Sequence, residues 1–195
     1  MTTARDAIAI LKTDHDEVER LFKRFEQLGP RAKKTKADIA ERVITALSQH
    51  AVIEEQVLYP AVRERMSDEE DTVLEALEEH HVVKWVLSEL DGMTPDHERF
   101  DAKFTVLAES VRHHVEEEEG ELFPKMRKGF SRSELQELGD ALTTARKSAP
   151  TKPHPRSPDE PPGNILAAAA TLPLDMARSA GETAVRRVKA AARGR

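Results

Sequence analysis

The chain of 195 residues contains no cysteine. Disulfide bonds, thiolate zinc sites, iron–sulfur clusters and cysteine nucleophiles are therefore excluded. Nitrogen and oxygen are left as the only strong donor atoms for a metal ion, which is compatible with iron, manganese or zinc. Aromatic residues are scarce as well, and Tyr59 is the only tyrosine. A phenolate ligand could therefore come from one position only.

Long apolar runs are also absent. The first residues, Met1 to Asp6, form no apolar signal core. No stretch approaches the roughly 20 uninterrupted apolar residues of a membrane-spanning helix. We therefore expect a cytoplasmic protein.

Charge is distributed unevenly along the chain. Residues 1–147 hold 22 Lys and Arg against 32 Asp and Glu, a net charge of −10, whereas residues 164–195 hold six against two, a net charge of +4. The acidic part is not expected to bind nucleic acid. Contact with an acidic partner or an anionic surface would have to come from the basic tail.

One sequence motif occurs twice. His50-x-x-x-Glu54 and His114-x-x-x-Glu118 lie 64 residues apart, and each is followed by leucine, an aromatic residue and proline. Residues four apart lie on one face of a helix, and an imidazole beside a carboxylate suits a transition metal. A single pair of this kind is more often a solvated surface couple, but its recurrence favours a duplicated metal-binding hairpin.

The intervening helices carry a second repeat. His15 and His80, 65 residues apart, have apolar followers at the same spacing. By pseudo-symmetry we assign His15 and His50 to one metal and His80 and His114 to the other. Glu54 and Glu118 would bridge the two ions at about 3.5–4 Å, which leaves coordination positions open for a small molecule.

Other residues near the repeats have weaker claims. Tyr59 is a candidate additional ligand, although core packing is the simpler explanation. Glu55, Glu117 and Glu119 are expected beside the ligands or in solvent. His81 and His113 are expected beside the ligand-bearing faces or on the surface.

The apolar spacing predicts an all-α protein, an up-down-up-down four-helix bundle with a short fifth helix on its outside. Pro60 is expected to kink the second helix, and Ser131 is expected to cap the fifth with a capping box. The predicted main helices cover residues 5–28, 38–66, 67–92 and from Thr94 onward. The bundle with its appended helix would occupy residues 1–147, followed by a proline-rich linker at 148–163 and a basic, alanine-rich tail at 164–195 that is partly helical or disordered.

The motif string resembles the hemerythrin-like, or HHE cation-binding, family over about residues 6–128, and most closely its actinobacterial members. The resemblance implies a non-heme di-iron centre, with two iron ions joined by an oxo or hydroxo bridge. In oxygen-carrying hemerythrins a further histidine lies four residues after the third-helix ligand, where this chain has Lys84. The departure argues against reversible oxygen carriage as the main role.

The expected function is therefore reaction with hydrogen peroxide, in a catalase-like or scavenging role during oxidative stress. The partners implied are small molecules: peroxide, oxygen or nitric oxide. Two alternatives do not require turnover. One is a sensor or reversible binder of oxygen or nitric oxide, and the other is iron storage or donation.

Overall fold

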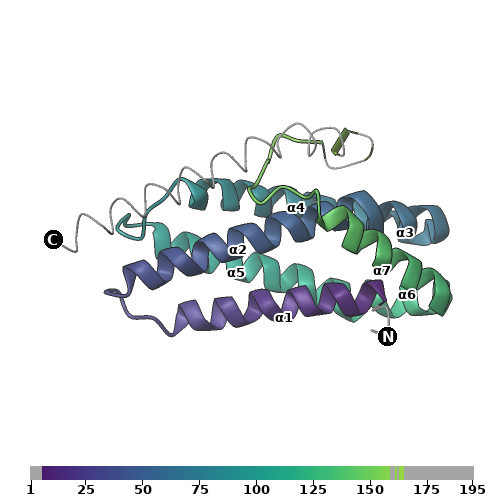
Figure 1. Ribbon diagram of the computed structural model, residues 1–195, viewed down its shortest axis with the longest axis horizontal. Helices are drawn as coiled ribbons and strands as arrows, with labels where there is room; N and C mark the ends of the chain where they lie inside the picture. Colours follow the sequence, from purple (N-terminus) through teal and green to yellow (C-terminus); the bar gives the residue numbers. More distant parts are fainter. Residues whose placement is uncertain (1–5, 159–160, 162, 165–195) are drawn as a thin grey trace.

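Four long helices lie side by side in the computed structural model, which describes residues 6–158, 161 and 163–164 (Figure 1). They are α1 (Ala7–Glu26), α2 (Lys33–Ile53), α4 (Glu70–Asp91) and α5 (Phe100–Glu117). Shorter elements complete the fold: η1 (Glu54–Leu58), α3 (Tyr59–Arg65), η2 (Ser67–Glu69), η3 (Glu118–Leu122), α6 (Phe123–Gly129) and α7 (Arg132–Arg146). The described residues contain no β-strand, and the predicted all-α four-helix bundle is confirmed.

A π-helical turn follows each histidine–glutamate repeat. The Tyr59 N–H donates to the Glu54 carbonyl, and the Phe123 N–H donates to the Glu118 carbonyl, five residues back in both cases. The sequence predicts a kink at Pro60; the structure has this wider turn immediately before the proline. Because proline lacks an N–H, the helical ladder is already interrupted there, and a π-turn accommodates the interruption within a continuous helix. Glu54 and Glu118 are the first residues of the two turns.

Three predicted helix starts differ from the structure. α2 begins at Lys33 rather than at residue 38. α5 begins at Phe100 rather than near Thr94, because a turn in which the His97 N–H donates to the Thr94 carbonyl comes first. Ser67 opens the short 3-10 turn η2 and makes no capping bond. The capping box at Ser131 is confirmed, since its hydroxyl accepts from the Glu134 N–H while the Glu134 carboxylate accepts from the Ser131 N–H.

The buried apolar side chains form two separate clusters along the bundle. One cluster includes Leu11, Ile53, Leu77 and Leu122, toward the end where α3, α6 and α7 lie. The other cluster includes Val18, Leu47, Val83 and Val111, which lie on α1, α2, α4 and α5. His15, His50, His80 and His114 fall between these two sets in the sequence of each helix. The polar residues therefore form a layer with apolar packing on both sides, which keeps bulk water away from them.

The proline-rich segment lies against the bundle instead of standing away from it. Ala149 and Asn164 are buried, and Lys152 pairs with Asp91 at the end of α4 at 2.5 Å. The Arg156 guanidinium lies over the Trp85 ring, 5.9 Å from its centre. The rest of the predicted tail, residues 165–195, falls outside the described residues. Among the helices that are described, none is both long and apolar enough to cross a membrane.

Candidate metal centre

Four histidine side chains, one from each long helix, converge in the polar layer. The Nε2 atoms of His15 and His50 are 3.1 Å apart, and those of His80 and His114 are also 3.1 Å apart. All four side chains are buried. Donor atoms that share an ion at about 2.1 Å lie roughly 3.0–3.5 Å from one another. The histidines thus form two pairs, each with a spacing that suits one metal ion.

Two carboxylates lie between the histidine pairs. Oε2 of Glu54 is 3.1 Å from Nε2 of His50 and 3.4 Å from Nε2 of His80. Oε2 of Glu118 is 3.5 Å and 3.7 Å from the Nε2 atoms of His15 and His114. Each carboxylate therefore faces one histidine of each pair, as a bridging ligand would. The structure brings all six residues together, and their role as ligands stays a prediction.

Within the described part of the chain, three of the four carboxylate oxygens of Glu54 and Glu118 have no hydrogen-bond partner, and the fourth accepts from Tyr59. Both oxygens of Glu54 and Oε2 of Glu118 are fully buried and make no hydrogen bond. The nearest imidazole nitrogens lie 3.1–3.7 Å from these oxygens, within ion-pair distance. A buried carboxylate without a hydrogen-bond partner is costly, and a cation would satisfy it. The donor set of four imidazoles and two carboxylates fits two first-row transition metal ions.

The Nδ1 atom of each of these four imidazoles contacts a further carboxylate. Glu55 contacts His80 at 3.1 Å, and Glu119 contacts His15 at 2.9 Å. Asp14 contacts His50 at 3.3 Å and Glu79 contacts His114 at 2.7 Å, and sequence reasoning missed both of these residues. Such partners fix the imidazole so that Nε2 points toward the metal. Asp14 and Glu79 are 65 residues apart, so the repeat itself carried a signal for them.

The electrostatics of the layer favour neutral donors at two positions and positive charge at the other two. Burial lowers the pKa of His15 to about 4 and also lowers the pKa of His80. Burial alone would lower the pKa of His50, but the Glu54 and Asp14 carboxylates outweigh it and raise that pKa to about 10. Burial and the charge of Glu54 raise the pKa of Glu118. The layer thus attracts positive charge, which a metal ion supplies when protons leave.

Tyr59 reaches the same layer from α3. Its side chain is fully buried, and its hydroxyl donates to Oε1 of Glu118 at 3.0 Å and lies 3.4 Å from Nε2 of His80. Burial and the Glu118 charge raise the pKa of Tyr59 well above its usual value. Tyr59 is therefore a neutral hydrogen-bond donor to a predicted ligand in this arrangement.

Lys84 does not point at the metal layer directly. It is buried, and its ammonium group donates to Oε1 of Glu55 at 2.9 Å, the same oxygen that contacts His80. The positively charged Lys84 ammonium group therefore lies next to the carboxylate that contacts the His80 imidazole. This contact holds Glu55 in place and neutralises its charge.

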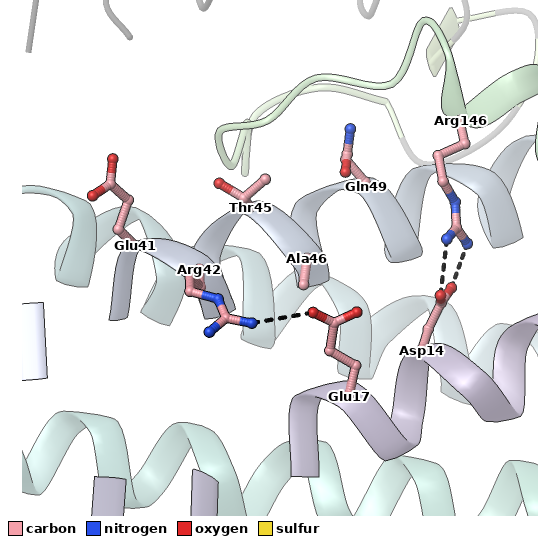
Figure 2. A pocket seen from close by; sticks show the side chains of 8 residues that line it. All are labelled: Asp14, Glu17, Glu41, Arg42, Thr45, Ala46, Gln49 and Arg146. Carbon is pink, nitrogen blue, oxygen red and sulfur yellow. Dashed lines mark hydrogen bonds and ion pairs between the residues drawn. The ribbon is translucent and has the colours of Figure 1, made fainter. Parts of the chain in front are cut away.

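α7 braces the opposite side of the layer through Asp14. Figure 2 shows the Arg146 guanidinium extending from α7 to Asp14, with Nη1 2.8 Å from Oδ1. Other charged residues line the same pocket of about 420 Å³, including Glu17, which pairs with Arg42. Arg146, Asp14 and His50 form a continuous chain of contacts from the surface to the metal layer.

A small chamber adjoins the histidines inside the bundle. Its volume is about 30 Å³, and its lining combines all four histidines and Asp14 with apolar side chains. A single water needs about 10–15 Å³ of such space, so the chamber has room for about two waters or one small oxygen species. The apolar lining consists of Val18, Leu47, Ala51, Val83, Val111 and Val115.

The remaining predicted neighbours lie outside the layer. His113 is exposed and close to Glu117, while His81 accepts a hydrogen bond from the Trp85 indole at 3.1 Å. These positions agree with the expectation that they lie on the surface or beside the ligand-bearing faces.

Several known proteins and one family model are similar to this chain. The family model described as "Hemerythrin HHE cation binding domain" matches residues 6–126. An uncharacterized hemerythrin-like protein of Schizosaccharomyces pombe is 30% identical over 133 residues, covering 68% of this chain and 66% of that protein. A DNA nickase of a Nostoc species is 28% identical over 70% of this chain, but the match covers only 38% of the nickase.

One solved structure resembles the fold. A hemerythrin HHE cation binding domain-containing protein from Mycobacterium kansasii matches 73% of this chain and 86% of its own, with a TM-score of 0.63 and 20% identity. At this identity the likeness supports the shared fold alone.

Proposed function

The chain belongs to the hemerythrin HHE cation-binding family, and from that premise we propose that it is a non-heme di-iron protein that decomposes hydrogen peroxide. His15 and His50 would hold one iron, and His80 and His114 the other. Glu54 and Glu118 would bridge them. Bound there, a pair of iron ions supplies two redox equivalents and Lewis acidity next to a small molecule.

The observation that carries the proposal is the combination of a six-residue donor set with the chamber beside it. Six side chains cannot fill the coordination positions of two ions that usually take five or six ligands each. The chamber beside these six residues is large enough for peroxide. A small uncharged substrate fits this space, whereas an extended one does not.

The protein's own residues would control water and protons around the substrate. The valine side chains of the chamber exclude bulk water. The Tyr59 hydroxyl, hydrogen-bonded to Glu118, places a hydrogen-bond donor inside the layer. Glu55, Glu119, Asp14 and Glu79 keep the imidazoles in the orientation that coordination requires.

Metal analysis and peroxide turnover test the proposal together. Protein purified from iron-supplemented cells is expected to contain two iron ions per chain and to show a near-ultraviolet charge-transfer absorption. Addition of peroxide should release oxygen in the stoichiometry of a catalase. Iron-loaded protein that neither consumes peroxide nor evolves oxygen would refute the enzyme reading. A spectral change with oxygen or nitric oxide but no turnover would point to a sensor.

Asp14 is expected to influence metal affinity without touching the metal. Asp14→Asn removes the charge that holds His50 and should lower metal affinity about 10–100-fold, the usual effect of losing such a partner. Competition with a chromophoric chelator measures the change. Glu17→Gln removes a carboxylate from the same pocket (Figure 2) and should leave the affinity unchanged. Equal affinities in the two variants would contradict a positioning role for Asp14.

A further inference from the structure

A third histidine–glutamate pair lies on the surface of α5, immediately beside a buried one. His113 and Glu117 are four residues apart and each precedes a residue of the His114–Glu118 pair, so they project about 100° further around the helix. Their side chains are 64% and 41% exposed. The Nε2 atom of His113 is 3.4 Å from Oε1 of Glu117.

Glu79 on α4 connects this exposed pair to the buried layer. Its Oε2 atom contacts Nδ1 of His114 at 2.7 Å, and its Oε1 atom lies 3.7 Å from Nε2 of His113. Glu79, His113 and Glu117 can offer one donor atom each, all within 4.8 Å of one another. Donors that share a zinc or iron ion at about 2.1 Å lie about 3.4 Å apart in tetrahedral geometry, so small side-chain rotations suffice.

Among the described residues, the first repeat has a positively charged partner that the Glu79 carboxylate does not have. Asp14 occupies the equivalent position to Glu79, and its carboxylate is neutralised by the Arg146 guanidinium from α7. In the described part of the chain, no lysine or arginine pairs with Glu79. The positions that correspond to His113 and Glu117 in the first repeat are Gln49 and Ile53, which provide no imidazole or carboxylate. At these two positions, the repeat that carries metal-type donors is therefore the one in which no guanidinium of the described residues contacts the carboxylate.

We propose that Glu79, His113 and Glu117 bind a divalent transition metal ion at the surface, one carboxylate away from the buried centre. One imidazole and two carboxylates suit Fe²⁺ or Zn²⁺, and water completes the coordination because two of the three side chains are well exposed. Glu78, the residue before Glu79 on α4, is also exposed and adds negative charge to this part of the surface. The ion takes the place that Arg146 fills beside Asp14, and it exchanges with solvent.

Zinc binding to the iron-loaded full-length protein tests this site. Equilibrium dialysis against micromolar zinc should show one additional zinc ion per chain with no loss of iron. His113→Ala should abolish this uptake, and Glu117→Gln should weaken it by about tenfold or more, because each removes one of only three protein donors. Glu79 is left unchanged in the test, since it also contacts His114.

Two variants control for surface charge and for histidine number. His97→Ala removes another exposed histidine, and Glu116→Gln removes an adjacent exposed carboxylate; both should keep the additional zinc ion. Zinc uptake matched by an equal release of iron would be exchange at the buried centre and would overturn the proposal. So would equal uptake by wild type and His113→Ala. These outcomes do not depend on peroxide turnover, so failure of this site and failure of the proposed reaction are distinguishable.

Discussion

Glu54→Ala is expected to abolish binding of both metal ions. Oε2 of Glu54 faces one histidine of each pair, at 3.1 Å from His50 and 3.4 Å from His80, so the substitution removes a ligand from both positions. Loss of an imidazole's outer partner alone costs about 10–100-fold in affinity, so loss of a shared ligand should exceed about 100-fold. Metal analysis of the purified variant measures the effect.

Glu116→Ala is the matched control for this substitution. Glu116 is an exposed glutamate that lies two residues before Glu118, and its removal should leave the metal content at the wild-type value. Because Glu54 is also a buried charge partner of His50, the variant must be compared with metal-free wild type to show that loss of metal is not loss of fold. Circular dichroism checks this. A folded Glu54→Ala protein with two iron ions would refute the bridging assignment.

Lys84→Met is expected to destabilise the protein by about 3–5 kcal/mol, the usual cost of leaving one member of a buried ion pair alone. The side chains of Lys84 and Glu55 are only 6% and 2% exposed, so the Glu55 carboxylate would lose its cation in a largely water-free environment. Urea unfolding of the metal-free proteins gives the difference in free energy without a contribution from metal binding.

Two comparisons separate a buried pair from a surface pair. Lys103 pairs with Glu89 at the surface, where the side chains are 24% and 59% exposed, so Lys103→Met should cost less than about 1 kcal/mol. The double variant Lys84→Met/Glu55→Gln removes both charges and should recover part of the loss. A cost for Lys84→Met no larger than that for Lys103→Met would show that the Lys84–Glu55 pair is effectively solvated.

The duplicated motif predicted the bundle and the six central residues because it acts within single helices. A four-residue spacing determines which side chains share a helix face, and the repeat determines which helices are equivalent. The pseudo-symmetry of the repeats grouped His15 with His50 and His80 with His114, the two pairs whose Nε2 atoms the structure places 3.1 Å apart.

Contacts between helices were harder to predict. Asp14 and Glu79 orient histidines on neighbouring helices, and their positions depend on how the helices pack, which periodicity does not specify. The predicted start of α5 was wrong because the hydrogen bond from the His97 N–H to the Thr94 carbonyl forms a turn that competes with the helix. The π-turns before Pro60 and Pro124 could not be predicted from periodicity, because they depend on how the backbone accommodates a missing donor. The composition of residues 148–158 gave no sign that this segment lies against the bundle.

The interruption of the apolar core by a polar layer links metal supply to the lifetime of the protein. The two clusters of buried apolar residues do not merge, so the ends of the bundle are coupled through the helix backbones and through whatever the layer binds. A bound ion that prefers the folded state makes unfolding more cooperative and opening rarer. Removal of a cation from the layer is therefore expected to make local opening at one end more frequent, which would be measured as faster proteolysis of the metal-free protein.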